Sequence, residues 1–246
     1  MAGFWNKVLK LQDDTRPFCT VIVPAAGTSS RMGGENKLMM ELCGVPVLMR
    51  TLQAIDAAEL VNEIILATRE ESMLEVGDLC SRAGLRKSIK VVLGGESRAE
   101  SVLAAAMEAS PKAKLLAVHD GARPLVLPTD IDHVIRYACN TYGAAPAIPV
   151  TDTIKVADAA GLVDHTPERR TLYAVQTPQV FRAELLKAAL QSAVAEGAEI
   201  TDDCSAVERM GKKVWLTEGS RENMKITTPI DLVIAEAILK ERGCDA

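Results

Sequence analysis

Residues 21–37 constrain the fold of this chain more than any other stretch. They read VIVPAAGTSSRMGGENK, a short β-branched run that gives way to small residues and then to two cations, Arg31 and Lys37. The β-branched run predicts a buried strand, and small residues let backbone N–H groups approach a ligand closely. A strand that leads into such a loop is typical of phosphate sites in α/β proteins, where amides donate hydrogen bonds and cations neutralise charge.

The loop matches neither of the common nucleotide-binding motifs. It contains no Gly-Lys-Ser/Thr ending and no Gly-x-Gly-x-x-Gly pattern, so it is neither a Walker loop nor a dinucleotide fingerprint. From this stretch alone, a turn that carries two solvated cations remains an alternative.

Composition narrows the class of protein. With 246 residues, 48% of them hydrophobic, the chain can bury the core of one large domain. Its net charge of −5 argues against a general nucleic-acid binder or a membrane-surface protein. The six cysteines show no C-x-x-C spacing, which favours reduced thiols in the cytoplasm over a disulfide framework or a zinc site. Residues 1–18 lack the apolar core of a signal peptide, and no apolar run is long enough to span a bilayer.

Strand-like runs alternate with helical segments as far as residue 150. After the first strand, further strands are expected at residues 63–67, 90–93, 114–119 and 144–150. This alternation predicts an α/β fold, a Rossmann-like, doubly wound, mostly parallel sheet covered by helices on both faces. Right-handed crossovers place the carboxyl ends of parallel strands at one edge of the sheet, where ligands bind. We expect residues 1–18 to be an N-terminal extension and residues 19–241 to form a single domain.

The alternation stops at residues 151–170, which are polar and carry Gly161 between two short apolar runs. This pattern predicts a hairpin arm outside the main sheet. Because an isolated hairpin is marginally stable in water, we expect the arm to pack on the same arm of a second copy, giving a homodimer. Beyond the arm we expect a strand at residues 172–175 and a tight connection at 176–179. Helices are expected at 182–195, just after 201 and at 229–239, and a late strand at 213–216.

Polar side chains gather just past the predicted strands. Arg31, Lys37, Ser101, Asp120, Arg123 and Lys225 occupy such positions, and a doubly wound sheet brings them to one rim. Several cations with one carboxylate suit a nucleoside triphosphate and Mg²⁺. A solvated turn carboxylate is the alternative for Asp120.

Two further polar groups are assigned structural roles. His119 is expected to end a strand, although histidine often has catalytic roles. Asp202 and Asp203 could be paired catalytic carboxylates, but acids in the first turn of a helix, favoured by the helix dipole, are the preferred interpretation.

A series of motifs in order along the chain resembles one known family. The motifs are PAAG with Arg31-Met32 and Lys37, GGESR with Ser101-Val102, HDGARP at 119–124, PVTDT at 149–153, TPQ at 177–179, ITDD at 200–203 and NMKIT at 223–227. Each motif alone is weak, but together, from about Thr20 to Leu239, they resemble the 2-C-methyl-D-erythritol 4-phosphate cytidylyltransferases. The resemblance implies transfer of a cytidylyl group from CTP to methylerythritol phosphate, with release of pyrophosphate, in isoprenoid precursor biosynthesis by the non-mevalonate pathway.

The resemblance also implies roles for individual residues. The expected catalytic residues are Arg31, Lys37, Lys225 and Arg169. CTP is expected to contact Pro24, Ala25, Ala26, Gly27, Gly94, Glu96, Ser101 and Asp120. The acceptor is expected to contact Asp120, Gly121, Arg123, Thr153, Arg169, Thr177 and Lys225, with Thr153 and Arg169 supplied by the arm. Mg²⁺ is the expected cofactor, held mainly through the CTP phosphates with Asp120 as a possible ligand.

Two other functions remain open at this point. A CDP-ribitol pyrophosphorylase shares the fold and most motifs, although the loop around Lys37 favours the first family. A regulatory module that binds nucleotide without catalysis is a different class, against which the set Arg31, Lys37 and Lys225 argues. Under each interpretation the partners are a nucleotide and small phosphates, not nucleic acid or a membrane.

Overall fold

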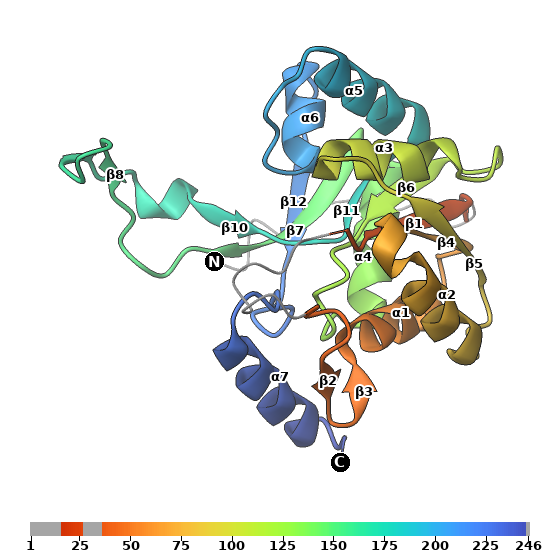
Figure 1. Cartoon of the computed structure of the whole chain (residues 1–246). Coiled ribbons are helices and arrows are strands. Elements are labelled where there is room, and N and C mark those ends of the chain that lie inside the picture. The colour runs from red at the N-terminus through yellow and green to blue at the C-terminus, as the bar shows by residue number, and fades with distance from the viewer. Residues whose placement is uncertain (1–15, 27–35, 245–246) are drawn as a thin grey trace.

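A central sheet of eight strands with helices on both faces forms the body of the protein (Figure 1). The computed structural model describes residues 16–26 and 36–244. The strand order is β10-β7-β11-β6-β1-β4-β5, and β12 also pairs with β7. The strands are β1 (Cys19–Pro24), β4 (Glu63–Thr68), β5 (Ser88–Leu93), β6 (Leu115–Val118), β7 (Gly143–Pro149), β10 (Tyr173–Val175), β11 (Gln179–Arg182) and β12 (Trp215–Glu218).

The predicted parallel arrangement is confirmed for most of this sheet. β1 pairs in parallel with both β4 and β6, β4 with β5, and β7 with β12. β10 and β11 are antiparallel to their neighbours. Strands of a sheet that is covered on both faces carry continuous apolar runs. This explains why β1 and β4 can be recognised as strands from the sequence.

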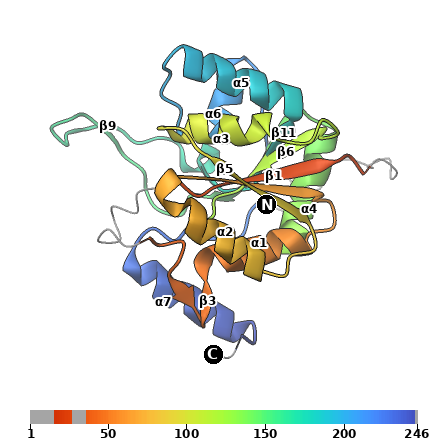
Figure 2. The ribbon, with the colours of Figure 1, turned by 45° about the vertical axis from the view of Figure 1, so that its right-hand side comes forward.

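Two hydrophobic cores lie on opposite faces of the sheet. Figure 2 shows that helices cover both of these faces. Val21 and Val23 of β1 face one core and Ile22 faces the other, as the two-residue period of a strand requires. The first core is covered by α1 (Val47–Ala57), α2 (Met73–Arg82) and α4 (Pro128–Cys139). The second is covered by α3 (Arg98–Met107), α5 (Ala183–Ala195) and α6 (Asp203–Arg209).

The remaining elements lie outside these layers. α7 (Pro229–Glu241) lies against a small hairpin of β2 (Glu41–Leu42) and β3 (Val45–Pro46), and a 3₁₀ turn, η3 (Glu70–Ser72), precedes α2. None of the helices in the described part of the chain is both long and apolar enough to cross a lipid bilayer.

The expectation for residues 176–182 was wrong. We expected a tight connection that leads into a helix, whereas Gln179–Arg182 forms β11, which enters the sheet between β6 and β7. Val180 and Phe181 are both fully buried and belong to opposite cores. A run this short carries no detectable period, so only the position of its neighbours identifies it as a strand.

The hairpin predicted for residues 151–170 is present. It contains β8 (Val156–Ala157), β9 (Val163–His165) and the 3₁₀ turn η4 (Arg169–Thr171), and it projects from the body next to β7 and β10 (Figure 1). Gly161 has a φ of +85° at the tip, a conformation that glycine adopts at little cost. Nearly every arm residue is exposed, including Ile154, Leu162 and Val163.

Candidate active site

A pocket opens at the carboxyl ends of β1 and β6, the edge where the topology predicts ligands to bind. Four cations and two carboxylates contribute to its wall, so it is strongly polar. Its lining residues are Pro24, Ala26, Lys37, Leu38, Arg69, Gly95, Glu96, Ser97, Arg98, Ser101, Asp120, Gly121, Ala122 and Lys225.

Backbone groups form one side of the pocket. The N–H of Ala25 donates to Ala67 O at 2.7 Å and that of Gly94 to Thr68 O at 2.7 Å, so both loops continue the sheet. Ser101 Oγ accepts from Gly95 N at 3.1 Å and lies so close to Gly94 that a Cβ there would meet it at 2.7 Å. Glycine is therefore required at this turn, and Ser101 fixes the loop as well as lining the pocket.

The loop passes directly into α3 through a capping box. Ser97 Oγ accepts from Glu100 N at 3.1 Å, and Glu100 Oε2 accepts from Ser97 N at 2.8 Å. The sequence pattern at 97–100 predicts this cap. The cap holds the first turn of α3 against the pocket.

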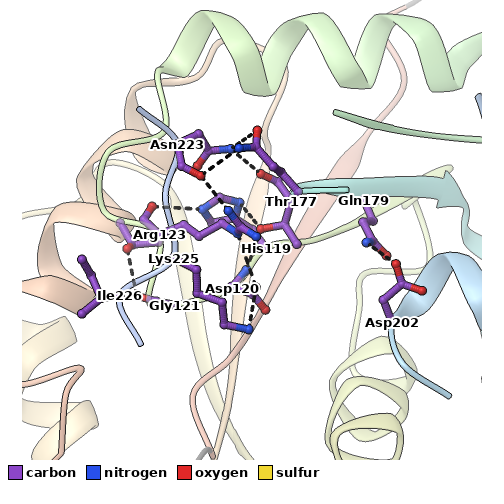
Figure 3. Close-up of polar contacts among 12 residues, drawn as sticks. His119, Asp120, Gly121, Arg123, Thr177, Gln179, Asp202, Asn223, Lys225 and Ile226 are labelled. Carbon is purple, nitrogen blue, oxygen red and sulfur yellow. Dashed lines mark hydrogen bonds and ion pairs between the residues drawn. The ribbon is translucent and has the colours of Figure 1, made fainter. Parts of the chain in front are cut away.

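Asp120 lies among three cations. Its Oδ2 is 3.0 Å from Lys225 Nζ and 3.4 Å from Arg123 Nε, and its Oδ1 is 3.8 Å from Arg98 Nη2. Figure 3 shows the Lys225 side chain pointing toward this carboxylate. Burial alone would raise the pKa of Asp120, but the charges of Lys225, Arg98 and Arg123 lower it to about 2. The carboxylate is therefore ionised at neutral pH, and the alternative of a solvated turn residue is wrong.

The two pocket lysines come from opposite ends of the chain. Lys37 Nζ donates to Ile226 O at 3.1 Å, and Ile226 N donates to Ala122 O at 2.8 Å. The segment that carries Lys225 is thus tied both to the first loop and to the loop after β6. These two hydrogen bonds of Ile226 bring opposite ends of the sequence together beside the carboxyl ends of β1 and β6, which are neighbours in the sheet.

Arg98 is a pocket residue that the sequence interpretation did not include among its site residues. Its Nη2 lies 2.7 Å from Asp203 Oδ2, and the Asp203 side chain is fully buried at the start of α6. Burial raises the pKa of Asp203, and Arg98 offsets only part of that effect. A signal was available, because a cation in the first turn of a helix opposes the helix dipole and calls for a nearby carboxylate.

The preferred interpretation of residues 202 and 203 is confirmed. Asp202 is the N-cap of α6, where its Oδ1 accepts from Ser205 N at 2.8 Å, and Asp203 lies in the first turn. Asp202 Oδ2 also accepts from Gln179 Nε2 at 2.8 Å, which fastens α6 to the beginning of β11.

His119 is linked to Asp120 through the hydroxyl of Thr177. Thr177 Oγ1 accepts from Asp120 N at 3.1 Å and lies 3.1 Å from His119 Nδ1, while His119 Nε2 lies 3.3 Å from Arg123 O. A neutral ring with its proton on Nε2 satisfies all three contacts. Burial lowers the pKa of His119 to about 4, which keeps the ring neutral. Thr177 and Arg123 contact Asp120 but do not themselves line the pocket.

Several expected site residues lie elsewhere. Arg169 is exposed on the arm, where its Nη1 donates to Thr151 O at 3.0 Å, and Thr153 is exposed on the same arm. Neither lines the pocket of its own chain. Gly27 and Arg31 lie outside the described residues.

The described residues could bind Mg²⁺ only together with phosphate oxygens of a bound ligand. No group of three or more histidine, cysteine, aspartate or glutamate side chains in the described chain could hold a metal ion. Asp120 and Glu96 are the carboxylates of the pocket. Since Mg²⁺ commonly takes one or two carboxylates and completes its shell with water and phosphate oxygens, a bound triphosphate would complete such a site.

Comparison with known proteins agrees with this geometry. Residues 19–241 match the family model described as 2-C-methyl-D-erythritol 4-phosphate cytidylyltransferase. The chain is 42% identical to the enzyme of that name from Desulforamulus reducens, covering 91% of this chain and 96% of the relative. It is 43% identical to the one from Caldanaerobacter subterraneus, covering 90% and 99%.

Solved structures give the same result for the fold. The crystal structure of 4-diphosphocytidyl-2C-methyl-D-erythritol synthase from Anaerococcus prevotii matches with a TM-score of 0.82 at 29% identity, covering 92% of this chain and all of that one. The 2-C-methyl-D-erythritol 4-phosphate cytidylyltransferase from Thermus thermophilus matches with a TM-score of 0.74 at 31% identity, covering 91% and 99%. The chain therefore belongs to the 2-C-methyl-D-erythritol 4-phosphate cytidylyltransferase family.

Proposed function

We propose that this pocket joins CTP to 2-C-methyl-D-erythritol 4-phosphate, giving 4-diphosphocytidyl-2-C-methyl-D-erythritol and pyrophosphate for isoprenoid precursor synthesis. The observation that carries the proposal is that Lys37, Arg98, Lys225 and Asp120 line one pocket in a chain of this nucleotidyltransferase family, with Arg98 and Lys225 beside the Asp120 carboxylate. Such a cluster matches the charge of a triphosphate and of a phosphorylated acceptor.

The nucleotide would occupy the side of the pocket that is built from backbone. Pro24, Ala25 and Ala26, continuing to Gly27, would approach the base and ribose together with Gly94, Glu96 and Ser101. Small residues suit this task because their amides and carbonyls can reach the ligand without steric obstruction. Arg31 and Lys37 would then hold the triphosphate.

The reaction requires one bond to form and one to break. An oxygen of the acceptor phosphate attacks the α-phosphorus of CTP, and the bond between that phosphorus and the β-bridging oxygen breaks, so pyrophosphate leaves with the electron pair. No covalent enzyme intermediate is needed. Lys225 and Lys37 would stabilise the negative charge that builds up on the α-phosphate, and this kind of transfer depends mainly on positioning and charge neutralisation.

Asp120 would hold Lys225 and the substrates in position and would not itself react. Its carboxylate fixes Lys225 at 3.0 Å, and it would accept a hydrogen bond from a ligand hydroxyl at the junction of the two substrates. Mg²⁺, held by the CTP phosphates with Asp120 as a possible ligand, would supply further neutralisation of the leaving pyrophosphate when bound.

The arm would complete the acceptor site of a second copy. Thr153 and Arg169 are exposed on a projecting hairpin that carries apolar side chains, and a two-fold dimer would carry them toward the partner's pocket. We therefore expect a homodimer in which each acceptor site has residues from both chains. The scattered cysteines, all of which are unpaired thiols, favour a reducing, cytoplasmic setting.

The test is incubation with CTP, Mg²⁺ and one acceptor at a time, with detection of pyrophosphate. Methylerythritol phosphate should support rapid release, whereas ribitol 5-phosphate should support little. Preference for ribitol phosphate would assign the chain to the related pyrophosphorylases. If neither acceptor leads to release of pyrophosphate, the proposal is overturned.

A further inference from the structure

The segment that carries Lys225 has no regular secondary structure. Residues 219–228 connect β12 to α7 without a helix or strand. A flexible connection would be a poor support for a lysine whose amine must meet a developing charge. The contacts that hold this connection in place therefore bear directly on the reaction.

Asn223 makes contacts of this kind with both its side chain and its backbone (Figure 3). It is only 3% exposed. Its Nδ2 donates to Thr177 O at 2.9 Å, and its backbone oxygen accepts from Arg123 Nη1 at 2.6 Å. Asn223 thus joins the Lys225 segment to the two segments that carry Thr177 and Arg123, both neighbours of Asp120.

Gln176 strengthens the same junction. Its Nε2 donates to Ser220 O at 2.7 Å and lies 3.3 Å from Asn223 O. A Cβ added at Gly219 would be only 2.7 Å from Gln176 Oε1. The beginning of the connection is therefore closely packed on Gln176. Two side-chain amides therefore fix the connection before the chain reaches Lys225.

We propose that Asn223 is a positioning residue that sets the place of Lys225 relative to Asp120. Its Nδ2 is the donor that pins the connection to Thr177, and Lys225 follows two residues later with Nζ 3.0 Å from Asp120 Oδ2. Asn223 need not contact substrate for this role. The proposal rests on the role proposed above for Lys225.

The expected consequence of losing Asn223 is local. Asn223→Ala leaves the buried carbonyl of Thr177 without its donor. The connection then keeps only the contacts of Gln176 with Ser220 O and Asn223 O as its tie to residues 176–178. A displacement of about 1 Å at a positioned group can lower a rate by roughly a hundredfold. We expect kcat/KM to fall by at least roughly tenfold, mainly in kcat. Asn223→Asp should act in the same way, because it keeps the size but loses the donor.

A double-mutant cycle tests whether Asn223 acts through Lys225. Asn223→Ala should cost roughly tenfold or more in the wild-type chain and less than about twofold in a Lys225→Ala chain, because the effects of two residues coupled through a backbone shift are not additive. Asn62→Ala is a matched control, since Asn62 Oδ1 accepts from Cys19 N at the opposite end of β1. This control should leave kcat/KM unchanged.

Amide hydrogen exchange gives a second readout that does not depend on turnover. Exchange of the Ile226 amide, which donates to Ala122 O, should be at least roughly tenfold faster in Asn223→Ala than in wild type or Asn62→Ala. An unchanged exchange rate, or an equal loss of activity in both backgrounds of the cycle, would overturn the proposal. Near-normal turnover by Lys225→Ala alone would instead overturn the proposed role of Lys225, and the exchange rate would still decide whether Asn223 holds the connection.

Discussion

Lys225 Nζ lies 3.0 Å from Asp120 Oδ2, and Lys225 is half-exposed whereas Asp120 is almost fully buried. The carboxylate therefore anchors an amine that still reaches the pocket. Because the pKa of Asp120 is lowered to about 2, this anchor persists at every pH at which the enzyme would operate. A fixed amine needs no reorganisation when negative charge develops beside it.

The first prediction concerns the two pocket lysines. Lys225→Ala and Lys37→Ala should each lower kcat/KM by roughly a hundredfold or more, as expected for loss of one preorganised charge donor. The fold should survive, because Asp120 keeps Arg98 and Arg123 as partners when Lys225 is lost. Lys90→Ala, which removes an exposed lysine paired with Glu108, serves as the control and should be fully active. Wild-type turnover by Lys225→Ala would contradict the assignment.

The second prediction concerns base selection. Hydrogen bonds of Ala25, Gly94 and Gly95 to Ala67 O, Thr68 O and Ser101 Oγ fix two loops, and the backbone of these loops lines one side of the pocket at Pro24, Ala26 and Gly95. Cytosine presents an amino donor where uracil presents an acceptor, and each mismatched buried group costs about 1–3 kcal/mol. CTP should therefore exceed UTP at least roughly tenfold in kcat/KM, measured by pyrophosphate release. Equal use of the two nucleotides would show that this side of the pocket does not read the base.

The third prediction concerns pH. The pKa of His119 is lowered to about 4 in the folded chain, while in the unfolded chain it stays near 6.5. Between these values the unfolded state binds more protons, so the free energy of unfolding falls as pH falls from about 6.5 to 4. The expected loss is about 3 kcal/mol. The lowered pKa of Asp120 adds a further loss below about pH 4, as that carboxylate is protonated.

Urea unfolding at several pH values measures this loss. His119→Gln, which cannot titrate, should flatten the dependence between pH 6.5 and 4 relative to wild type. If the variant and the wild type show the same slope in that window, another group is responsible.

The fourth prediction concerns the buried ion pair of Arg98 and Asp203. Arg98→Met leaves a carboxylate that is fully buried without its partner, which typically costs about 3–5 kcal/mol. Adding Asp203→Asn removes the stranded charge and should recover most of the lost stability in urea unfolding. A double variant no more stable than Arg98→Met would show that Asp203 does not depend on Arg98.

The fifth prediction concerns the arm. If Arg169 serves the partner's pocket, a dimer of one Arg169→Ala chain and one Lys225→Ala chain has one site with both defects and one with neither. Each variant alone should be nearly inactive, and subunit exchange should restore activity toward roughly a quarter of wild type. Exchange that is verified by mixed-dimer formation and restores nothing would exclude the shared site, as would a monomeric protein at working concentration.

Prediction from sequence succeeded where a local pattern determines the structure. Continuous apolar runs identified β1 and β4, and the pattern at 97–100 identified the cap of α3, because each depends on residues close together in the chain. β11 was missed because four residues have no measurable period and its place depends on β6 and β7. The partnership of Arg98 with Asp203 was missed because it joins two helices that are distant in sequence.

The candidate site shows the same division. Asp120, Lys37 and Lys225 could be inferred from their positions after strands, and the structure brings them to one pocket. The support that Asn223 and Gln176 give to Lys225 could not be inferred, because it depends on hydrogen bonds between segments that are more than forty residues apart in sequence. Such contacts depend on how two irregular connections meet.

The order in which the pocket residues occur along the chain has a consequence for synthesis. Lys37 comes from the first loop, Ser101 and Asp120 from the middle, and Lys225 from the last connection before α7. A chain that is still on the ribosome can form β1, β4 and β6 and yet lack the amine that faces Asp120. A pocket lined by both lysines is therefore complete only after residue 225 has been synthesised.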